Sequence, residues 1–128
     1  MKKHLLTIAG LVCFTTSVVH ADEKYSHFPS LKAPTTSAAL CNLAAYNQKL
    51  QAIVNKKELS PEDMVKVHEL TYTLENAVIK LQKDLETIAV DLEKVHKASE
   101  HLDQKIIKGS GDEYLIATQS ILASSTCK

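Results

Sequence analysis

The feature that most constrains the fold of this chain is an apolar heptad stripe in its second half. Alternating steps of three and four residues from Met64 reach thirteen positions, of which eleven are apolar, and no Gly or Pro interrupts them. This spacing keeps side chains on one face of a helix that packs against other helices, as in a coiled coil. The sequence therefore predicts a long central helix, over about 61–101 or 61–108, with a packed face made of Met64, Val67, Thr71, Leu74, Val78, Leu81, Leu85, Ile88, Leu92, Val95, Ser99, Leu102 and Ile106.

The start of this helix is marked by four consecutive residues. Ser60 is a favourable N-cap, Pro61 suits the first helical position, and Glu62 and Asp63 place negative charge in the first turn. We therefore expect the long helix to begin at Pro61.

A shorter amphipathic helix is predicted before it, from about Thr36 to near Lys57. Its connection to the long helix is only a few residues, so the two should form an antiparallel hairpin. The first half of the long helix also carries a broad apolar face, which needs more than one neighbour to cover it. The additional apolar positions are Val65, Leu70, Tyr72, Ala77 and Ile79.

The end of the long helix has two readings. Gly109, Gly111 and a capping Asp112 would end it at 108–112, with a last helix of about three turns beyond them. Alternatively, the chain turns at 101–103 and Asp103 caps a helix that contains both glycines, at a cost of roughly 2 kcal/mol relative to alanine. Either reading predicts an all-α antiparallel bundle of three or four helices, in which the first and last helices meet beside the middle of the long one.

The N-terminal 21 residues have the pattern of a signal peptide. A short basic start precedes an apolar run, and Val19 and Ala21 suit cleavage after Ala21. A retained anchor, or a lipoprotein through Cys13, is the alternative, although Val12 fits poorly before a lipidated cysteine. We expect a periplasmic protein without a stable membrane span after cleavage, with an extended lead-in over 22–35 and a single helical domain over 36–128.

The charge of the mature chain argues against nucleic acid as a partner. After cleavage 13 of the 15 lysines remain with all 15 acidic residues, so the formal net charge is 13 − 15 = −2. The chain contains no Arg, the side chain that best binds phosphate and carboxylate groups in a bidentate manner.

Two cysteines remain in the mature chain, Cys41 and Cys127. An even number in an exported protein favours a disulfide. A loop of that length would stabilise the fold by on the order of 4–5 kcal/mol in the chain-entropy model. Two free thiols or an intermolecular bond are the alternatives.

Candidate metal and haem ligands are few. Lys-Val-His occurs twice, which places His68 and His96 on one helix face but ~42 Å apart. Glu93 and His96 have the spacing of di-iron helix bundles, and His96, Glu100 and His101 could form a surface site for zinc or copper. Met64 could be a haem ligand only with a histidine from another helix, and a core position is the simpler reading. Thr71 and Ser99 either set the helix register or bond to their own backbone carbonyls.

Several segments resemble a family of small exported bacterial proteins catalogued only as a domain of unknown function. The resembling pieces are Tyr46–Leu50, Leu59–Met64, Val67–Ala77, Val95–Glu100 and Gly111–Leu115. The resemblance implies an all-helical periplasmic protein and brings no activity with it. One departure is at His101-Leu102, where the family often has a small residue or glycine.

These observations predict a non-enzymatic helical protein without a cofactor. A heptad stripe longer than either short helix can cover suggests that it self-associates or binds a protein partner. A metal- or haem-binding bundle is the alternative, and no nucleophile motif or phosphate loop indicates an enzyme.

Overall fold

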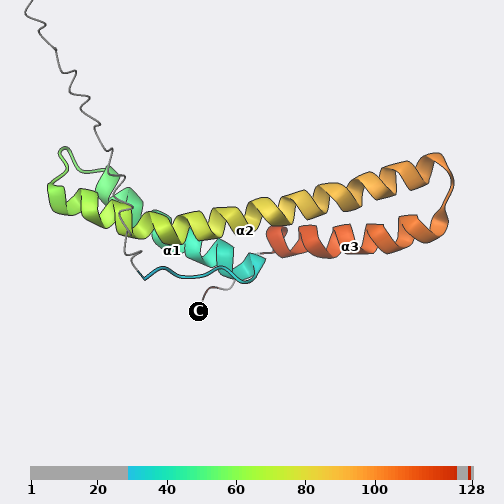
Figure 1. Cartoon of the computed structure of the whole chain (residues 1–128), viewed down its shortest axis with the longest axis horizontal. Coiled ribbons are helices and arrows are strands. Elements are labelled where there is room, and N and C mark those ends of the chain that lie inside the picture. The colour runs from blue at the N-terminus through green and yellow to red at the C-terminus, as the bar shows by residue number, and fades with distance from the viewer. Residues whose placement is uncertain (1–28, 124–126, 128) are drawn as a thin grey trace, which may run out of the picture.

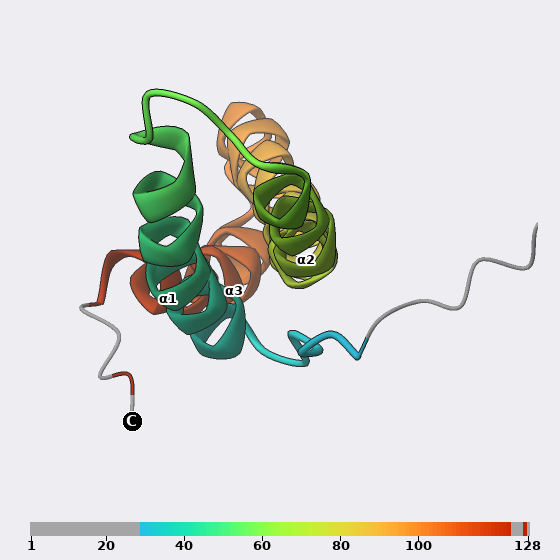
Figure 2. The same cartoon turned by 90° about the vertical axis from the view of Figure 1, so that its left-hand side faces the viewer.

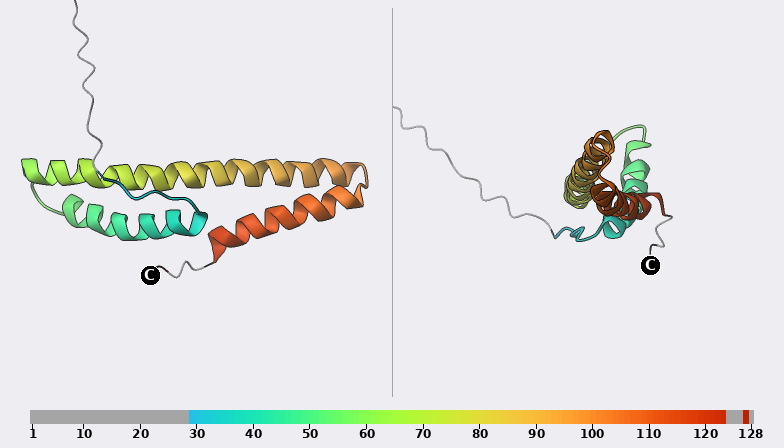
Figure 3. Two further views of the ribbon diagram at one scale, coloured as in Figure 1. Left: turned by 60° about the horizontal axis from the view of Figure 1, so that its bottom comes forward. Right: turned by 90° about the vertical axis from the view of Figure 1, so that its right-hand side faces the viewer.

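The computed structural model describes residues 29–123 and 127, and these residues contain three α-helices and no strand. They are α1 (Thr36–Val54), α2 (Pro61–Glu100) and α3 (Gln104–Leu122). Figure 1 shows α2 as one long rod, with α1 beside its first part and α3 beside its second part. The two short helices meet near the middle of α2, as expected (Figure 3). The prediction of an all-α fold built on a long central helix is confirmed.

Helix α2 begins as its sequence predicts. The Asp63 N–H donates to Ser60 Oγ and the Ser60 N–H donates to Asp63 Oδ2, both at 3.2 Å, which completes a capping box. Lys56 Nζ lies 2.7 Å from Asp63 Oδ1. The Lys56 ammonium, together with the backbone N–H of Ser60, holds the pKa of Asp63 below its usual value.

Helix α1 is slightly shorter than expected. Thr35 caps its start by accepting a hydrogen bond from the Ala38 N–H at 3.1 Å. The helix ends at Val54 with Asn55 as C-cap, and does not extend to Lys57. Lys56 therefore lies in the connection, where it binds the first turn of α2 through Asp63.

The chain leaves α2 at residues 101–103, so the glycine-rich stretch at 108–112 does not end the long helix. Leu102 takes up a left-handed backbone conformation, with φ of 55°. Asp103 then caps α3 by accepting hydrogen bonds from Lys105 N–H and Ile106 N–H, each at 3.1 Å. Gly109 and Gly111 lie within α3, which is longer than the three turns expected of a helix that starts after them.

The packed face of α2 differs from the prediction by half of its positions. The predicted positions Leu74, Leu81, Ile88 and Val95 face the short helices. The positions that alternate with them in the stripe are shifted, because each covered residue stands one place earlier in the sequence than the predicted residue. None of the members of this covered stripe is exposed. The covered stripe comprises Val67, Leu70, Leu74, Ala77, Leu81, Asp84, Ile88, Asp91, Val95 and Ala98.

Two segments cover the first half of α2. Leu70 and Leu74 pack with Ile53 of α1 in the main apolar cluster, flanked by Leu43 and Leu50 among others. The lead-in lies against α2 beside this cluster. There the Leu31 N–H donates to Thr73 Oγ1 at 3.1 Å, and the Asn76 amide donates to Ser30 Oγ at 3.2 Å and to the Leu31 carbonyl at 3.1 Å. The second neighbour expected for this half is thus, in part, the chain's own lead-in.

A disulfide links the beginning of the bundle to its end. Cys41 in α1 bonds to Cys127 beyond α3, with the two Cα atoms 5.4 Å apart. Seen from one end of the molecule, α1 and α3 lie close to one another beside α2 (Figure 2). The bond therefore connects the two short helices across the middle of the long one, and the expected intramolecular pairing is confirmed.

Candidate functional site

The other half of the predicted stripe lies on the surface. Val78, Leu85 and Leu92 repeat every seven residues and have 53%, 55% and 47% of their area exposed. The lead-in binds Thr73 and Asn76 on one side of the covered stripe. These three residues lie next to the covered stripe on its other side. Their expected burial is therefore wrong.

This apolar surface continues onto α3. One groove is lined by Val78, Leu81, Gln82, Leu85, Glu86 and Ala89, and a second by Leu85, Ile88, Tyr114, Leu115, Thr118, Ile121 and Leu122. The two grooves share Leu85. Leu115 and Leu122 are 61% and 77% exposed. We name as the open flank the three exposed residues of α2 and these two of α3: Val78, Leu85, Leu92, Leu115 and Leu122.

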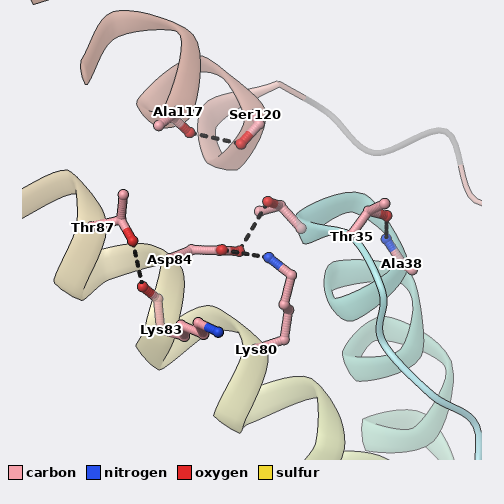
Figure 4. A network of polar contacts seen from close by, with 9 residues as sticks. Thr35, Ala38, Lys80, Lys83, Asp84, Thr87, Ala117 and Ser120 are labelled. Atoms are coloured by element: carbon pink, nitrogen blue, oxygen red, sulfur yellow. Dashed lines mark hydrogen bonds and ion pairs between the residues drawn. The ribbon is translucent and has the colours of Figure 1, made fainter. Parts of the chain in front are cut away.

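Asp84, an acidic residue of the covered stripe, connects α2 to α1. The Thr36 hydroxyl donates to Asp84 Oδ2 at 3.0 Å, and Lys80 forms an ion pair with Asp84 Oδ1 (Figure 4). Burial opposes ionisation of Asp84, but the Lys80 and Thr36 hydrogen bonds and the nearby positive charges outweigh it, so the pKa of Asp84 lies below its usual value. This contact ties the first turn of α1 to the middle of α2.

A similar pair lies under α3. Asp91 is buried in the covered stripe and accepts a hydrogen bond from Lys94 Nζ at 2.8 Å. The hydrogen bond and charge of Asp91, with the charge of Glu113 added, raise the pKa of Lys94. Lysine side chains that reach back to the covered stripe thus neutralise the acids that it buries.

The candidate metal ligands are not brought together. His96 Nε2 lies 3.5 Å from Glu100 Oε1, but Glu93 pairs with Lys97 at 3.0 Å, and these side chains are more than half exposed. Among residues 29–123 and 127, no three His, Cys, Asp or Glu side chains are placed to hold one metal ion. His96 and Glu100 lie one turn apart and are in contact. His101 is the C-cap of α2 and is not part of this contact.

The two histidines of the repeated Lys-Val-His lie on one unbroken helix. His68 Nε2 is 3.2 Å from the Tyr72 hydroxyl, with the rings edge to face. At 1.5 Å per residue, 28 residues of continuous helix separate His68 from His96 by ~42 Å. The prediction that both histidines lie on one continuous helix is confirmed.

Three further residues of the predicted stripe have different roles. Met64 is 59% exposed, so its assignment to the core was wrong. Thr71 and Ser99 donate their hydroxyls to the carbonyls of His68 and His96, at 2.8 Å and 2.6 Å. These are the backbone bonds that the sequence allowed, and they satisfy both hydroxyls without a neighbouring helix.

In the part of the chain that the structure describes, no helix has the length and apolar character needed to cross a membrane. No curated protein and no solved structure matches the chain. The model of a family of unknown function, DUF6746, matches residues 1–123. The resemblance read from the motifs is thereby confirmed, and the chain belongs to the DUF6746 family.

Proposed function

We propose that this protein is a non-enzymatic periplasmic module, an antiparallel bundle that binds another polypeptide chain, a partner or a second copy, through the open flank. The observation that carries the proposal is the row Val78, Leu85 and Leu92, which lies exposed beside a stripe that the chain covers itself. Exposed apolar patches of this kind mark interaction surfaces in soluble proteins.

The chemistry of the open flank supports binding over catalysis. The groove at its centre is lined mainly by the aliphatic side chains of Val78, Leu81, Leu85 and Ala89, with Gln82 and Glu86 beside them. Aliphatic side chains supply no acid, base or nucleophile, but they release water when another apolar surface covers them. The two grooves that meet at Leu85 give such a surface a continuous course from α2 to α3.

Export is part of the same proposal. It is supported by the signal-peptide pattern of residues 1–21 and by the Cys41–Cys127 bond, since disulfides persist in oxidising compartments. Mass spectrometry of the protein released from the periplasm should find an N-terminus at Asp22. A chain that begins at Met1, or that carries lipid on Cys13, would contradict this part.

Photo-crosslinking in the native host tests the binding function. A benzoylphenylalanine at position 85 should give a discrete adduct, because this position lies where both grooves meet. The matched control places the same group at position 83, an exposed residue on the lead-in side of α2.

The mass of the adduct separates the two versions of the proposal. Twice the mass of the chain would indicate self-assembly, and any other single mass would indicate a partner protein. If positions 78, 85 and 92 give no more adduct than position 83, the open flank binds no polypeptide and the proposed function is wrong.

A further inference from the structure

We infer that a groove between the lead-in and α2 binds a phosphate monoester, with the phosphate held by Lys32 and Lys83 and the organic part of the ligand resting on Ile79. This inference goes beyond the proposed function, because the groove lies on the lead-in side of α2 and its ligand is not a polypeptide. It follows from an excess of positive charge in a groove that the fold holds in place.

The walls of this groove are fixed by hydrogen bonds from both neighbouring helices to the lead-in. The Asn76 amide of α2 donates to Ser30 Oγ at 3.2 Å and to the Leu31 carbonyl at 3.1 Å. The Asn42 amide of α1 donates to the Lys32 carbonyl at 3.3 Å. Three residues of the lead-in and four of α2 line the groove, whose volume of about 460 Å³ is in the range of small-molecule sites.

Three of the lining residues are lysines, Lys32, Lys80 and Lys83, and none of the lining residues is acidic. Lys80 forms an ion pair with Asp84, and Lys83 lies next to this pair (Figure 4). Among residues 29–123 and 127, neither Lys32 nor Lys83 takes part in an ion pair. One carboxylate thus faces three ammonium groups, so the groove keeps an excess of positive charge.

The acidic residues nearby belong to other surfaces. Glu86 lines the groove of the open flank and accepts a hydrogen bond from Gln82 Nε2 at 3.4 Å. Two other grooves that are lined by lysines also include an acidic residue, Glu69 in one and Asp103 in the other. The groove at the lead-in differs from both, because its lining combines lysines with no carboxylate.

The polar groups of the groove match a phosphate monoester. The chain has no arginine, so it offers lysine ammonium groups, which bind phosphate as point charges. A phosphate monoester carries close to two negative charges at neutral pH, the number that Lys32 and Lys83 together neutralise. The Ser30 hydroxyl accepts its hydrogen bond from Asn76 and keeps its own hydrogen to donate to a phosphate oxygen.

The groove also offers a surface to the organic part of the ligand. Ile79 is 63% exposed, and Ala33 lines the groove from the lead-in. Covering this surface releases water, so a phosphate that carries an apolar group should bind better than inorganic phosphate. A soluble phosphate monoester and a lipid headgroup share this chemistry.

Three probes test the inference by nuclear magnetic resonance titration of the disulfide-bonded protein at about pH 8, where the phosphate probes are dianions. Phenyl phosphate carries the dianion and an apolar ring, benzenesulfonate carries the same ring with a single charge, and inorganic phosphate lacks the ring. Phenyl phosphate should bind about fivefold more tightly than either of the others. It should shift the backbone amide signals of residues 30–33 and 76–83, and added salt should weaken its binding.

Two matched double variants assign the binding to this groove. Lys32→Gln with Lys83→Gln should weaken the binding of phenyl phosphate about tenfold or more, because both unpaired ammonium groups are lost. Lys49→Gln with Lys66→Gln removes two lysines that line another groove and should leave the affinity unchanged. All four lysines are exposed, so circular dichroism should show that both variants keep the helical content of the parent protein.

Sedimentation with lipid vesicles distinguishes the two sources of the ligand. Phosphatidic acid carries a phosphate monoester headgroup, whereas phosphatidylcholine does not. If phosphatidic acid vesicles carry down the parent protein but not the variant Lys32→Gln with Lys83→Gln, the ligand is a lipid headgroup. If phenyl phosphate binds and neither kind of vesicle carries the protein down, the ligand is a soluble phosphate monoester.

Several results would overturn the inference. They are equal affinities for phenyl phosphate and benzenesulfonate, amide shifts confined to residues outside this groove, and equal losses of affinity in the two double variants. Absence of binding to both phenyl phosphate and phosphatidic acid vesicles would overturn it as well. None of these results bears on the open flank, whose crosslinking at position 85 is measured separately.

Discussion

In its first half α2 buries Leu70 and Leu74 against Ile53 of α1, whereas in its second half it buries Ile88, Asp91 and Ala98 beside α3. The first interface contains a cluster of large aliphatic side chains, with Thr73 and Ala77 also buried, and it is bordered by the lead-in. The second combines one large aliphatic residue with a buried carboxylate and a small residue. The same helix is thus packed in two different ways along its length.

The partner helices show the same contrast. The buried residue of α3 is Ser110, and a Cβ added to Gly111 would come within 3.9 Å of Val95 Cγ2. The side chain that α3 buries is thus a small one, while its large residues Leu115, Ile116 and Leu122 are mostly exposed. We conclude that the α1 half carries most of the apolar stability and that the α3 half keeps apolar surface available for binding.

Loss of the disulfide should have the largest effect. Replacing Cys41 and Cys127 by serine opens a loop with a sequence separation of 86 residues. The chain-entropy model predicts a fall in the free energy of unfolding on the order of 4 kcal/mol. Urea denaturation measures the fall, and hydrogen exchange should show α3 losing protection before α1. Earlier loss in α1 would reverse our ranking of the two halves.

Leucine truncations on the two faces of α2 should differ strongly. Leu74→Ala creates a cavity in the cluster with Ile53 and should cost about 3 kcal/mol of unfolding free energy. Leu92→Ala makes the same chemical change on the open flank and should cost less than about 1 kcal/mol. The midpoints of chemical denaturation test the pair. Similar losses would show that Leu92 is packed in solution, as it would be in a self-associated form.

Local sequence signals predicted the elements of this fold well. The Ser60–Asp63 capping box set the start of α2, and the uninterrupted heptad spacing predicted a helix that turned out to span 40 residues. The turn at 101–103 was harder to predict from the sequence, because Leu102 adopts a left-handed conformation that favours glycine or asparagine. The sequence offered two glycines elsewhere, and both lie within a helix.

The side of α2 that packs could not be predicted by counting apolar residues. The positions of Val78, Leu85 and Leu92 are more apolar than those of Ala77, Asp84 and Asp91, yet the latter are the covered ones. Aspartates are rarely buried unless they are paired. The available signal was the lysine three or four residues from each, Lys80 for Asp84 and Lys94 for Asp91. The three α2 residues of the open flank were therefore part of the predicted stripe, but the sequence analysis assigned them to the packed face.

Removing the Asp84 carboxylate should have an intermediate effect. Asp84→Asn weakens the contacts with Thr36 and Lys80 and should lower the free energy of unfolding at pH 7 by about 1–2 kcal/mol. Because the folded pKa of Asp84 is depressed, its contribution is fully present above the unfolded value near 4 and is lost as the pH falls through the folded pKa. The difference between the two proteins, measured by urea denaturation, should therefore shrink below about pH 4. A difference that does not depend on pH would show that Asp84 acts through packing alone.

The smallest effect is a gain in stability, expected from a substitution inside α3. Gly109 lies inside α3, and an added Cβ would meet no atom within 4 Å. Gly109→Ala should therefore raise the free energy of unfolding by about 0.5–1 kcal/mol, because alanine has less backbone entropy to lose in a helix. Gly111→Ala should gain less, since its Cβ would lie in ordinary contact with Val95. Thermal unfolding compares the two variants, and hydrogen exchange should place the added protection in α3 and leave that of α1 unchanged. A loss of stability in Gly109→Ala would mean that this position leaves the helix in solution, in which case the α3 half would be weaker than its packing against α2 suggests.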